Sequence, residues 1–198
     1  MTGRFFYLTH PQVHIDPDVP VPDWGLSDTG LTRAKLAAAA PVFSGLVRIF
    51  SSAERKAMET AGLIAAARKL PVTILPRIHE NDRSATGFLP PDEFETVADA
   101  FFARPEESIR GWETASDVQH RIVSEAMPLF EIAVREGDVL MVGHGAVGTL
   151  LYCRLAGKPI SRTHDQPAGG GHLFAYDPAS DRILCTWTPI EALPEQLV

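Results

Sequence analysis

The chain has 198 residues, a length at which single domains with a substantial core are common, and we expect one domain over residues 1–198. Its composition is 45% hydrophobic and 22% charged, which is ordinary for a globular protein, and its net charge of −7 argues against a nucleic-acid partner. No apolar run is long enough to span a membrane, and the two cysteines, Cys153 and Cys185, lie in apolar runs, so we expect a reduced, soluble, cytoplasmic protein without a disulfide framework.

The first part of the chain predicts two strands and two helices. The apolar run "RFFYLT" predicts a strand, and the Pro- and Asp-rich segment from His14 to Asp28 predicts a loop. An alanine-rich helix is expected from about Ser27 to Ala40, because Ser and Asp favour helix starts and Pro41 stops the helix. "GLVRIFSS" predicts a second strand, and "SAERKAMETAGLIAAARKL" predicts a helix with Ser52 as its cap.

The rest of the chain is also predicted to form strands and helices in alternation, with a hairpin at the end. "PVTILPRI" predicts a strand, Asn81–Pro91 a polar loop, and the residues from about Asp92 to Ala103 and from Thr114 to Arg135 two helices. "DVLMVG" is an unbroken apolar run of the kind that lies in a parallel sheet covered on both faces, and "AVGTLLYCRLAG" predicts the helix after it. "GHLFAYD" and "RILCTW" flank "PASD" and predict a hairpin. The pattern predicts a three-layer α/β/α fold with a mostly parallel central sheet.

Polar residues end or closely follow four of these strands. His10 follows "FFYLT", His144 follows "VLMVG", Ser51-Ser52 ends a strand, and Glu80 comes just after "VTILPRI". A lone histidine is more often a structural residue, but ligands of such sheets bind outside the carboxyl ends of the strands. One of the two histidines also precedes a predicted helix N-terminus, which favours an anion. The pair therefore suggests a phosphate site.

The order and spacing of these motifs resemble the histidine phosphatase superfamily, which has the phosphoglycerate-mutase-like fold. The family's Arg-His-Gly motif corresponds to Thr9-His10-Pro11, and its Leu-Ser-x-x-Gly motif corresponds to Leu26–Gly30. The Ser-Ser-Pro-Leu-x-Arg-Ala-x-Gln-Thr-Ala motif corresponds to "SSAERKAMETA" (Ser51–Ala61), and the late His-Gly follows "VLMVG". "GWETASDVQHRI" is similar to the family's Gly-Glu-Ser segment. The resemblance extends from residue 5 to about residue 156.

The resemblance implies a metal-independent phosphomonoesterase that acts on a small phosphorylated molecule. His10 would become phosphorylated, while His144 and Lys56 would stabilise the transferring phosphoryl group. Glu80 would protonate the leaving oxygen and then activate water, with Glu113 as the alternative acid. The resemblance implies no metal and no cofactor, and the sequence leaves the oligomeric state open.

The phosphate site departs from the family at two arginines. Thr9 replaces the arginine before the first histidine, and Lys56 replaces the arginine of the second motif. Arginine holds phosphate with a planar fork whereas lysine is a flexible point charge, and losing one charged hydrogen bond costs about 1.5–3 kcal/mol. Arg83 or Arg55 could compensate, and the Thr9 hydroxyl could contact a phosphate oxygen; the other reading of Arg83 is a surface arginine paired with Asp82 or Glu80.

Three functions remain open at this stage. The first is the phosphatase, the second is a catalytically weakened relative that binds a phosphorylated ligand or partner without turnover, and the third is a phosphoglycerate mutase. The mutase is disfavoured because the segment after Glu80 is short and the site has few arginines. Specificity is expected in the loops Gln12–Asp23 and Asn81–Pro91. The aromatic residues Trp24, Phe88 and Trp112 could line the pocket or belong to the core.

Overall fold

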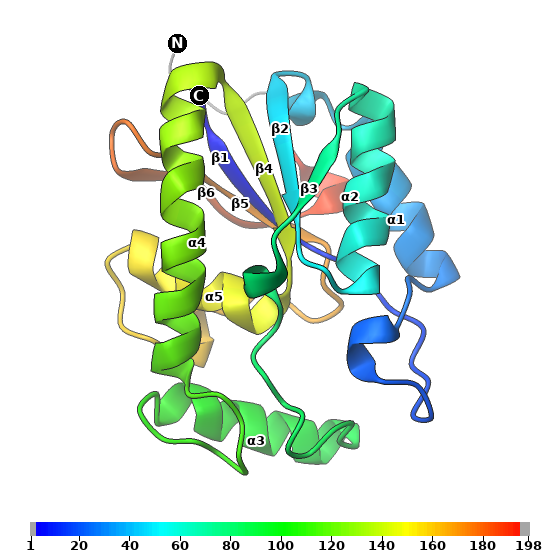
Figure 1. The fold of residues 1–198 in the computed structure, drawn as a ribbon, viewed down its shortest axis with the longest axis vertical. Coiled ribbons are helices and arrows are strands. Elements are labelled where there is room, and N and C mark those ends of the chain that lie inside the picture. The colour runs from blue at the N-terminus through cyan, green and yellow to red at the C-terminus, as the bar shows by residue number, and fades with distance from the viewer. Residues whose placement is uncertain (1–2, 195–198) are drawn as a thin grey trace.

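A six-stranded sheet forms the centre of the computed structural model, which describes residues 3–194 (Figure 1). The strands are β1 (Phe5–Thr9), β2 (Leu46–Ser51), β3 (Val72–Ile74), β4 (Asp138–Gly143), β5 (His172–Asp177) and β6 (Arg182–Pro189). Their order across the sheet is β3-β2-β4-β1-β5-β6. The first four strands are parallel, whereas β5 runs antiparallel to β1 and β6 runs antiparallel to β5. The predicted mostly parallel sheet with a late hairpin is confirmed.

Helices cover both faces of this sheet. The helices are α1 (Asp28–Ala39), α2 (Arg55–Arg68), α3 (Pro91–Ala103), α4 (Ala115–Glu136) and α5 (Gly145–Leu155). The pair α1 and α2 lies on one face and the pair α4 and α5 on the other, while α3 lies beyond the N-terminal end of α4, near the carboxyl edge of the sheet (Figure 1). The predicted three-layer α/β/α fold is therefore confirmed. No helix within residues 3–194 is both long and apolar enough to cross a membrane.

The apolar runs of the central strands are unbroken because both of their faces are buried. In β1, Phe5 and Tyr7 pack in the cluster formed with α4 and α5, whereas Phe6 and Leu8 pack in the cluster formed with α1 and α2. The side chains of β4 alternate between the two clusters in the same way. Burying each large apolar side chain contributes about 1.5–3 kcal/mol, so the two central strands anchor the sheet from which the site emerges.

One predicted helix cap is confirmed and another is wrong. Ser27 caps α1 by accepting a hydrogen bond from Gly30 N at 3.1 Å. The predicted Ser52 cap of α2 is wrong, because the N-cap is Glu54 and its side chain makes no capping bond. Ser52 still belongs to the sheet edge, since its N–H donates to Val142 O at 3.0 Å, and the chain needs two more residues to turn into the helix.

The third predicted strand is shorter than the sequence suggested. Pairing with β2 ends at Ile74, and Pro76–Ile78 form a 3₁₀ turn. Proline lacks the N–H that a strand ladder needs, so Pro76 cannot extend the pairing. This turn directs Glu80 back toward the carboxyl edge of the sheet.

Candidate active site

The register of β1 and β4 places the two strand-end histidines side by side. Thr9 lies opposite Gly143 in this parallel pair, so His10 and His144 leave the sheet as neighbours. His10 N donates to Gly143 O at 3.0 Å, and the two imidazole centroids are 5.2 Å apart with the rings inclined at 69°. The structure thus brings together two residues that are 134 positions apart, as expected for neighbouring parallel strands.

A cavity of about 650 Å³ opens at this edge of the sheet. Five of the residues predicted for the site line it, namely His10, Lys56, Glu80, Arg83 and His144. Thr9 and Arg55 are not among its lining residues. Within residues 3–194 there is no group of three or more His, Cys, Asp or Glu side chains arranged to hold a metal ion.

His10 has the hydrogen bonding that a nucleophilic imidazole requires. Its Nδ1 lies 2.8 Å from the carbonyl oxygen of Pro11, and because a carbonyl can only accept, Nδ1 carries the proton and Nε2 carries the lone pair. Burial, with the nearby cations Lys56 and Arg83, lowers the pKa of His10 to about 4, although the bond to Pro11 opposes this. The imidazole is therefore neutral at neutral pH.

His144 is fully buried, and hydrogen bonds fix both its backbone and its ring. The Tyr7 hydroxyl donates to His144 O and accepts from His144 N, both at 3.0 Å. Gly148 makes this possible, because a Cβ there would lie 2.3 Å from the Tyr7 ring. His144 Nδ1 has no partner among the described residues, and burial lowers the pKa of the ring well below its ordinary value. An anionic ligand would offset that loss of basicity.

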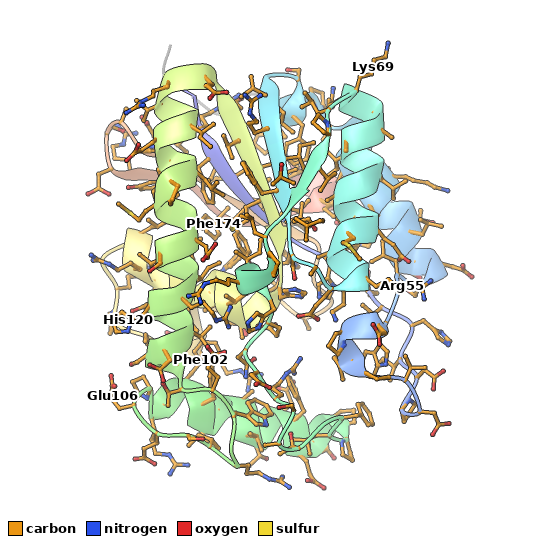
Figure 2. The ribbon with its side chains drawn as sticks, in the orientation of Figure 1. Arg55, Lys69, Phe102, Glu106, His120 and Phe174 are labelled. Atoms are coloured by element: carbon orange, nitrogen blue, oxygen red, sulfur yellow. The ribbon has the colours of Figure 1, made fainter. Side chains whose placement is uncertain are left out.

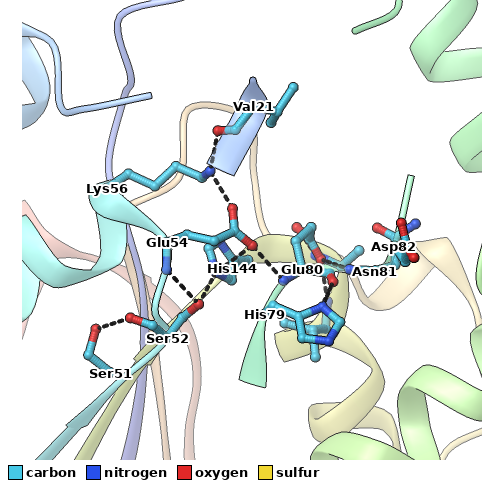
Figure 3. A network of polar contacts seen from close by, with 12 residues as sticks. Val21, Ser51, Ser52, Glu54, Lys56, His79, Glu80, Asn81, Asp82 and His144 are labelled. Carbon is cyan, nitrogen blue, oxygen red and sulfur yellow. Dashed lines mark hydrogen bonds and ion pairs between the residues drawn. The ribbon is translucent and has the colours of Figure 1, made fainter. Parts of the chain in front are cut away.

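Glu54 is the central acid of the site, and the sequence analysis did not single it out (Figure 3). One carboxylate oxygen accepts from Lys56 Nζ at 2.5 Å. The other lies 3.3 Å from His144 Nε2 and accepts from Glu80 N at 2.9 Å. Burial raises the pKa of Glu54, but His144 and Lys56 outweigh it and bring the pKa to about 2. A buried anion therefore neutralises the lysine predicted to hold phosphate.

Glu80 lies across the start of α5. Its carboxylate accepts from Ala146 N at 3.3 Å, Val147 N at 3.1 Å and Asn81 N at 3.1 Å. The helix N-terminus that was expected to attract phosphate thus gives two of its free N–H groups to Glu80. Burial is the main influence on Glu80, and it raises the pKa of this carboxyl above its ordinary value despite nearby Arg83. A raised pKa suits a proton donor.

Two of the four predicted phosphate ligands, Arg83 and Lys56, line the cavity, but their surroundings differ. Arg83 lines the cavity, with its guanidinium 5.1 Å from the Phe94 ring centroid and 5.6 Å from that of Trp112. It makes no ion pair within residues 3–194, so the reading as a surface arginine paired with Asp82 or Glu80 does not hold. The other two cations of the cavity are paired, Lys56 with Glu54 and Arg162 with Glu95 and Asp99.

Arg55 and Thr9, the other two predicted phosphate ligands, do not line the cavity. Arg55 is mostly exposed and pairs with Glu59 at 2.7 Å, one helix position away from Lys56 and therefore on another side of α2 (Figure 2). Thr9 is buried, and its hydroxyl donates to Gln166 Oε1 at 2.6 Å while accepting from His172 N at 2.9 Å. Its single O–H donor, the group that could contact a phosphate oxygen, is used inside the fold.

Glu113, the alternative acid, lies outside the cavity. It accepts from Arg121 Nη2 at 2.8 Å and from Asp82 N at 3.1 Å. Burial raises the pKa of Glu113, but the bonds from Arg121 and Asp82 dominate and lower it. Arg121 also donates to the carbonyls of Arg77 and His79, at 2.6 and 3.1 Å, so this pair fixes the segment that carries Glu80.

Two further features escaped the sequence analysis. Asn81 is 5% exposed, lines the cavity, and has an Nδ2 without a partner among the described residues. Gly170 has φ +64°, and a Cβ there would lie 2.3 Å from His10 O, while Gly171 N donates to that oxygen at 3.0 Å. The run of three glycines at 169–171 was a visible signal for such a close approach.

The Lys56–Glu54 pair gives a stability prediction. Lys56→Met leaves a carboxylate buried without its main partner, and we expect it to lower the free energy of unfolding by about 3 kcal/mol. Adding Glu54→Gln removes that charge while keeping an acceptor for Glu80 N, so the double variant should recover most of the loss in urea unfolding. The exposed pair Arg104–Glu107 is the matched control, with an expected coupling below about 1 kcal/mol. Additive losses at positions 54 and 56 would contradict the assignment.

Known structures share the fold over almost the whole chain. A mycobacterial glucosyl-3-phosphoglycerate phosphatase in complex with inorganic phosphate is 22% identical, with a TM-score of 0.73, covering 96% of this chain and 100% of that one. A putative alpha-ribazole-5'-P phosphatase from Escherichia coli is 19% identical, with a TM-score of 0.72 and 99% of both chains covered. The alpha-ribazole phosphatase from Shigella flexneri is 21% identical, with a TM-score of 0.69, covering 94% of this chain and 95% of that one.

The sequence itself matches a family model. The model is that of the histidine phosphatase superfamily (branch 1), and the match spans residues 14–185. The chain therefore belongs to this superfamily. His10 precedes the matched range, and its place in the site follows from the geometry of β1 and β4. No curated protein matched the sequence.

Proposed function

We propose that the chain is a phosphomonoesterase that works without a metal, through a phosphohistidine at His10. The observation that carries this proposal is the His10 imidazole, neutral and with its tautomer fixed by Pro11 O, beside the buried His144 in an open cavity. A nucleophilic imidazole needs a free lone pair and a held partner nitrogen, and His10 has both. Membership of the superfamily supports the reaction class.

The reaction would proceed in two displacements. Nε2 of His10 attacks phosphorus, the N–P bond forms, and the ester P–O bond breaks as Glu80 gives its proton to the leaving oxygen. Water then gives a proton to the Glu80 carboxylate and attacks phosphorus, and the N–P bond returns its electron pair to Nε2. His144, protonated as the dianion binds, and Arg83 would stabilise the charge on the phosphoryl oxygens.

The second candidate function is binding of a phosphorylated ligand without turnover. The observation that favours it is Glu54, whose carboxylate neutralises Lys56 and lies near His144. Thr9 and Arg55 do not line the cavity. Arg83 is therefore the one lysine or arginine of the site that makes no ion pair in the described part of the chain. A site with so little net positive charge would bind the phosphoryl group weakly in the ground state and in the transition state.

Turnover in the presence of a chelator separates these functions. We expect the purified protein to release inorganic phosphate from aryl and alkyl phosphates in EDTA, at a rate that added Mg²⁺ or Zn²⁺ does not increase. Release of phosphate that depends on added metal would contradict the metal-independent mechanism. Binding of phosphate esters by calorimetry with no release over many hours would favour the second function.

A further inference from the structure

A second cavity of about 990 Å³ adjoins the first, and Trp24, Glu80 and Arg83 line both. We call this second cavity the apolar chamber. One of its walls is formed by residues 15–24 and the other by residues 79–95. Glu54 also lines the chamber, from outside these two segments. Its large apolar wall residues are Ile15, Val19, Val21, Trp24, Phe88, Leu89 and Phe94. The volume is far more than a phosphate group needs and falls in the range of small-molecule sites.

The walls of the apolar chamber expose side chains that a soluble surface would normally bury. Ile15 is 56% exposed and Phe88 is 37% exposed, and both line the chamber. The rings of Phe88 and Trp24 lie 5.7 Å apart, so the two walls meet through aromatic contact. Grouped exposed apolar side chains on facing segments are typical of a ligand groove.

A buried donor lies at the junction of the two cavities. Asn81 lines both, is 5% exposed, and has an Nδ2 without a partner in the described part of the chain. Buried polar groups are almost always hydrogen-bonded, so this donor calls for an acceptor from a ligand. An ester oxygen or an oxygen near it would supply that acceptor.

The charges of the apolar chamber exclude one kind of ligand. Its carboxylates are Asp18, Glu54, Glu80, Asp82 and Glu95, whereas Arg83 is the only lysine or arginine among its lining residues within 3–194. Lys56 pairs with Glu54 and Arg162 with Glu95, and Glu80 holds a proton in the proposed mechanism, so Asp18 and Asp82 are the acids without an ion pair in the described part of the chain. A second phosphate or a carboxylate on the alcohol part of the substrate would face these two acids with no further lysine or arginine of the chamber to meet it. Unpaired like charges are an effective means of rejecting a ligand.

We infer that the substrate is a phosphomonoester of a large, uncharged and mostly apolar alcohol, whose apolar part occupies the apolar chamber. Its phosphate lies at His10 and His144, and Asn81 donates a hydrogen bond to an oxygen beside the phosphate. The inference rests on the proposed function for the position of the phosphate. It adds the class of substrate and the residues that select it.

Alkylphosphonates test the chamber without requiring turnover. We expect hexylphosphonate to bind at least about 30-fold more tightly than ethylphosphonate in calorimetry, because each buried methylene adds roughly a fourfold gain. Placing a carboxylate at the end of the hexyl chain should weaken binding by about tenfold or more. Equal affinities for the ethyl and hexyl compounds, or tighter binding of the carboxylate compound, would overturn the inference.

The walls are tested by two variants and a control. Phe88→Ala and Ile15→Ala should each reduce the affinity for hexylphosphonate by about fivefold to 20-fold and leave that for ethylphosphonate unchanged. Met127→Ala removes an equally exposed apolar side chain from α4 and should change neither. If hexyl selectivity survives both wall variants, the apolar part binds elsewhere and the chamber assignment is wrong.

Turnover of the matched esters keeps this inference separate from the proposed function. Ethyl and hexyl phosphate have similar leaving groups, so kcat/KM should favour hexyl phosphate through the chamber alone. If neither ester is hydrolysed while hexylphosphonate still binds selectively, the proposed phosphatase fails and the ligand class stands. If both are hydrolysed with equal kcat/KM, the phosphatase stands and the ligand class is overturned.

Discussion

His10→Ala is expected to abolish phosphate release, with kcat falling by roughly 10⁴–10⁶-fold, as occurs when the nucleophile of a covalent mechanism is removed. The reason is geometric as well as chemical. His10 Nδ1 is tied to Pro11 O, so Nε2 is the ring atom with a lone pair, and burial keeps the ring neutral by lowering its pKa to about 4. His144 also has a neutral ring with its Nε2 held, by Ser52 and Glu54, but its Nδ1 is buried, whereas the His10 side chain lines the cavity.

The measurement should pair steady-state turnover with trapping of the intermediate. Wild-type protein mixed with a radiolabelled ester and quenched in base should retain label in an acid-labile bond, and His10→Ala should retain none. His120→Ala is the matched control, because His120 is exposed on α4 (Figure 2) and away from the cavity. Normal turnover by a folded His10→Ala variant would remove His10 from the mechanism.

Much of the scaffold around His10 follows from the sequence. Unbroken apolar runs predicted the central strands β1 and β4, because strands with both faces buried need apolar residues at every position. The residues that follow two parallel strands reach the same edge of the sheet, and the pairing of Thr9 with Gly143 makes His10 and His144 neighbours. Strand order and register then depend on contacts far apart in the chain, which local patterns do not contain.

The ion pairs and hydrogen bonds of the site were much harder to predict from the sequence. Glu54 and Lys56 are two positions apart, and such residues on a helix do not face each other. They meet because Glu54 is the N-cap of α2, with an extended backbone at φ −71° and ψ 138°. The only sequence signal was a glutamate where the family motif has leucine. Likewise, the Thr9 hydroxyl is hydrogen-bonded to Gln166 and His172, which lie more than 150 residues away in the sequence.

The pH dependence of the proposed reaction follows from the protonation of Glu80 and His10. Burial raises the pKa of Glu80, so this group holds its proton to a higher pH than an exposed glutamate, and His10 releases its proton at about pH 4. Attack needs a neutral His10 and a protonated Glu80. We therefore expect kcat/KM to rise as the pH increases through about 4 and to fall again above the raised pKa of Glu80.

Glu80→Gln should remove that descending limb and slow esters of poor leaving groups by about 10²–10⁴-fold, because glutamine has no proton to give to an alkoxide. Aryl phosphates, whose phenolate leaves without help, should be slowed far less in the first displacement. The glutamine amide oxygen can still accept from Val147 N, so the start of α5 should keep its position. The matched variant is Glu113→Gln, since Glu113 is the other nearby glutamate and lies outside the cavity. Equal slowing of alkyl and aryl esters by Glu80→Gln, or a leaving-group dependence that appears only in Glu113→Gln, would show that Glu80 is not the proton donor.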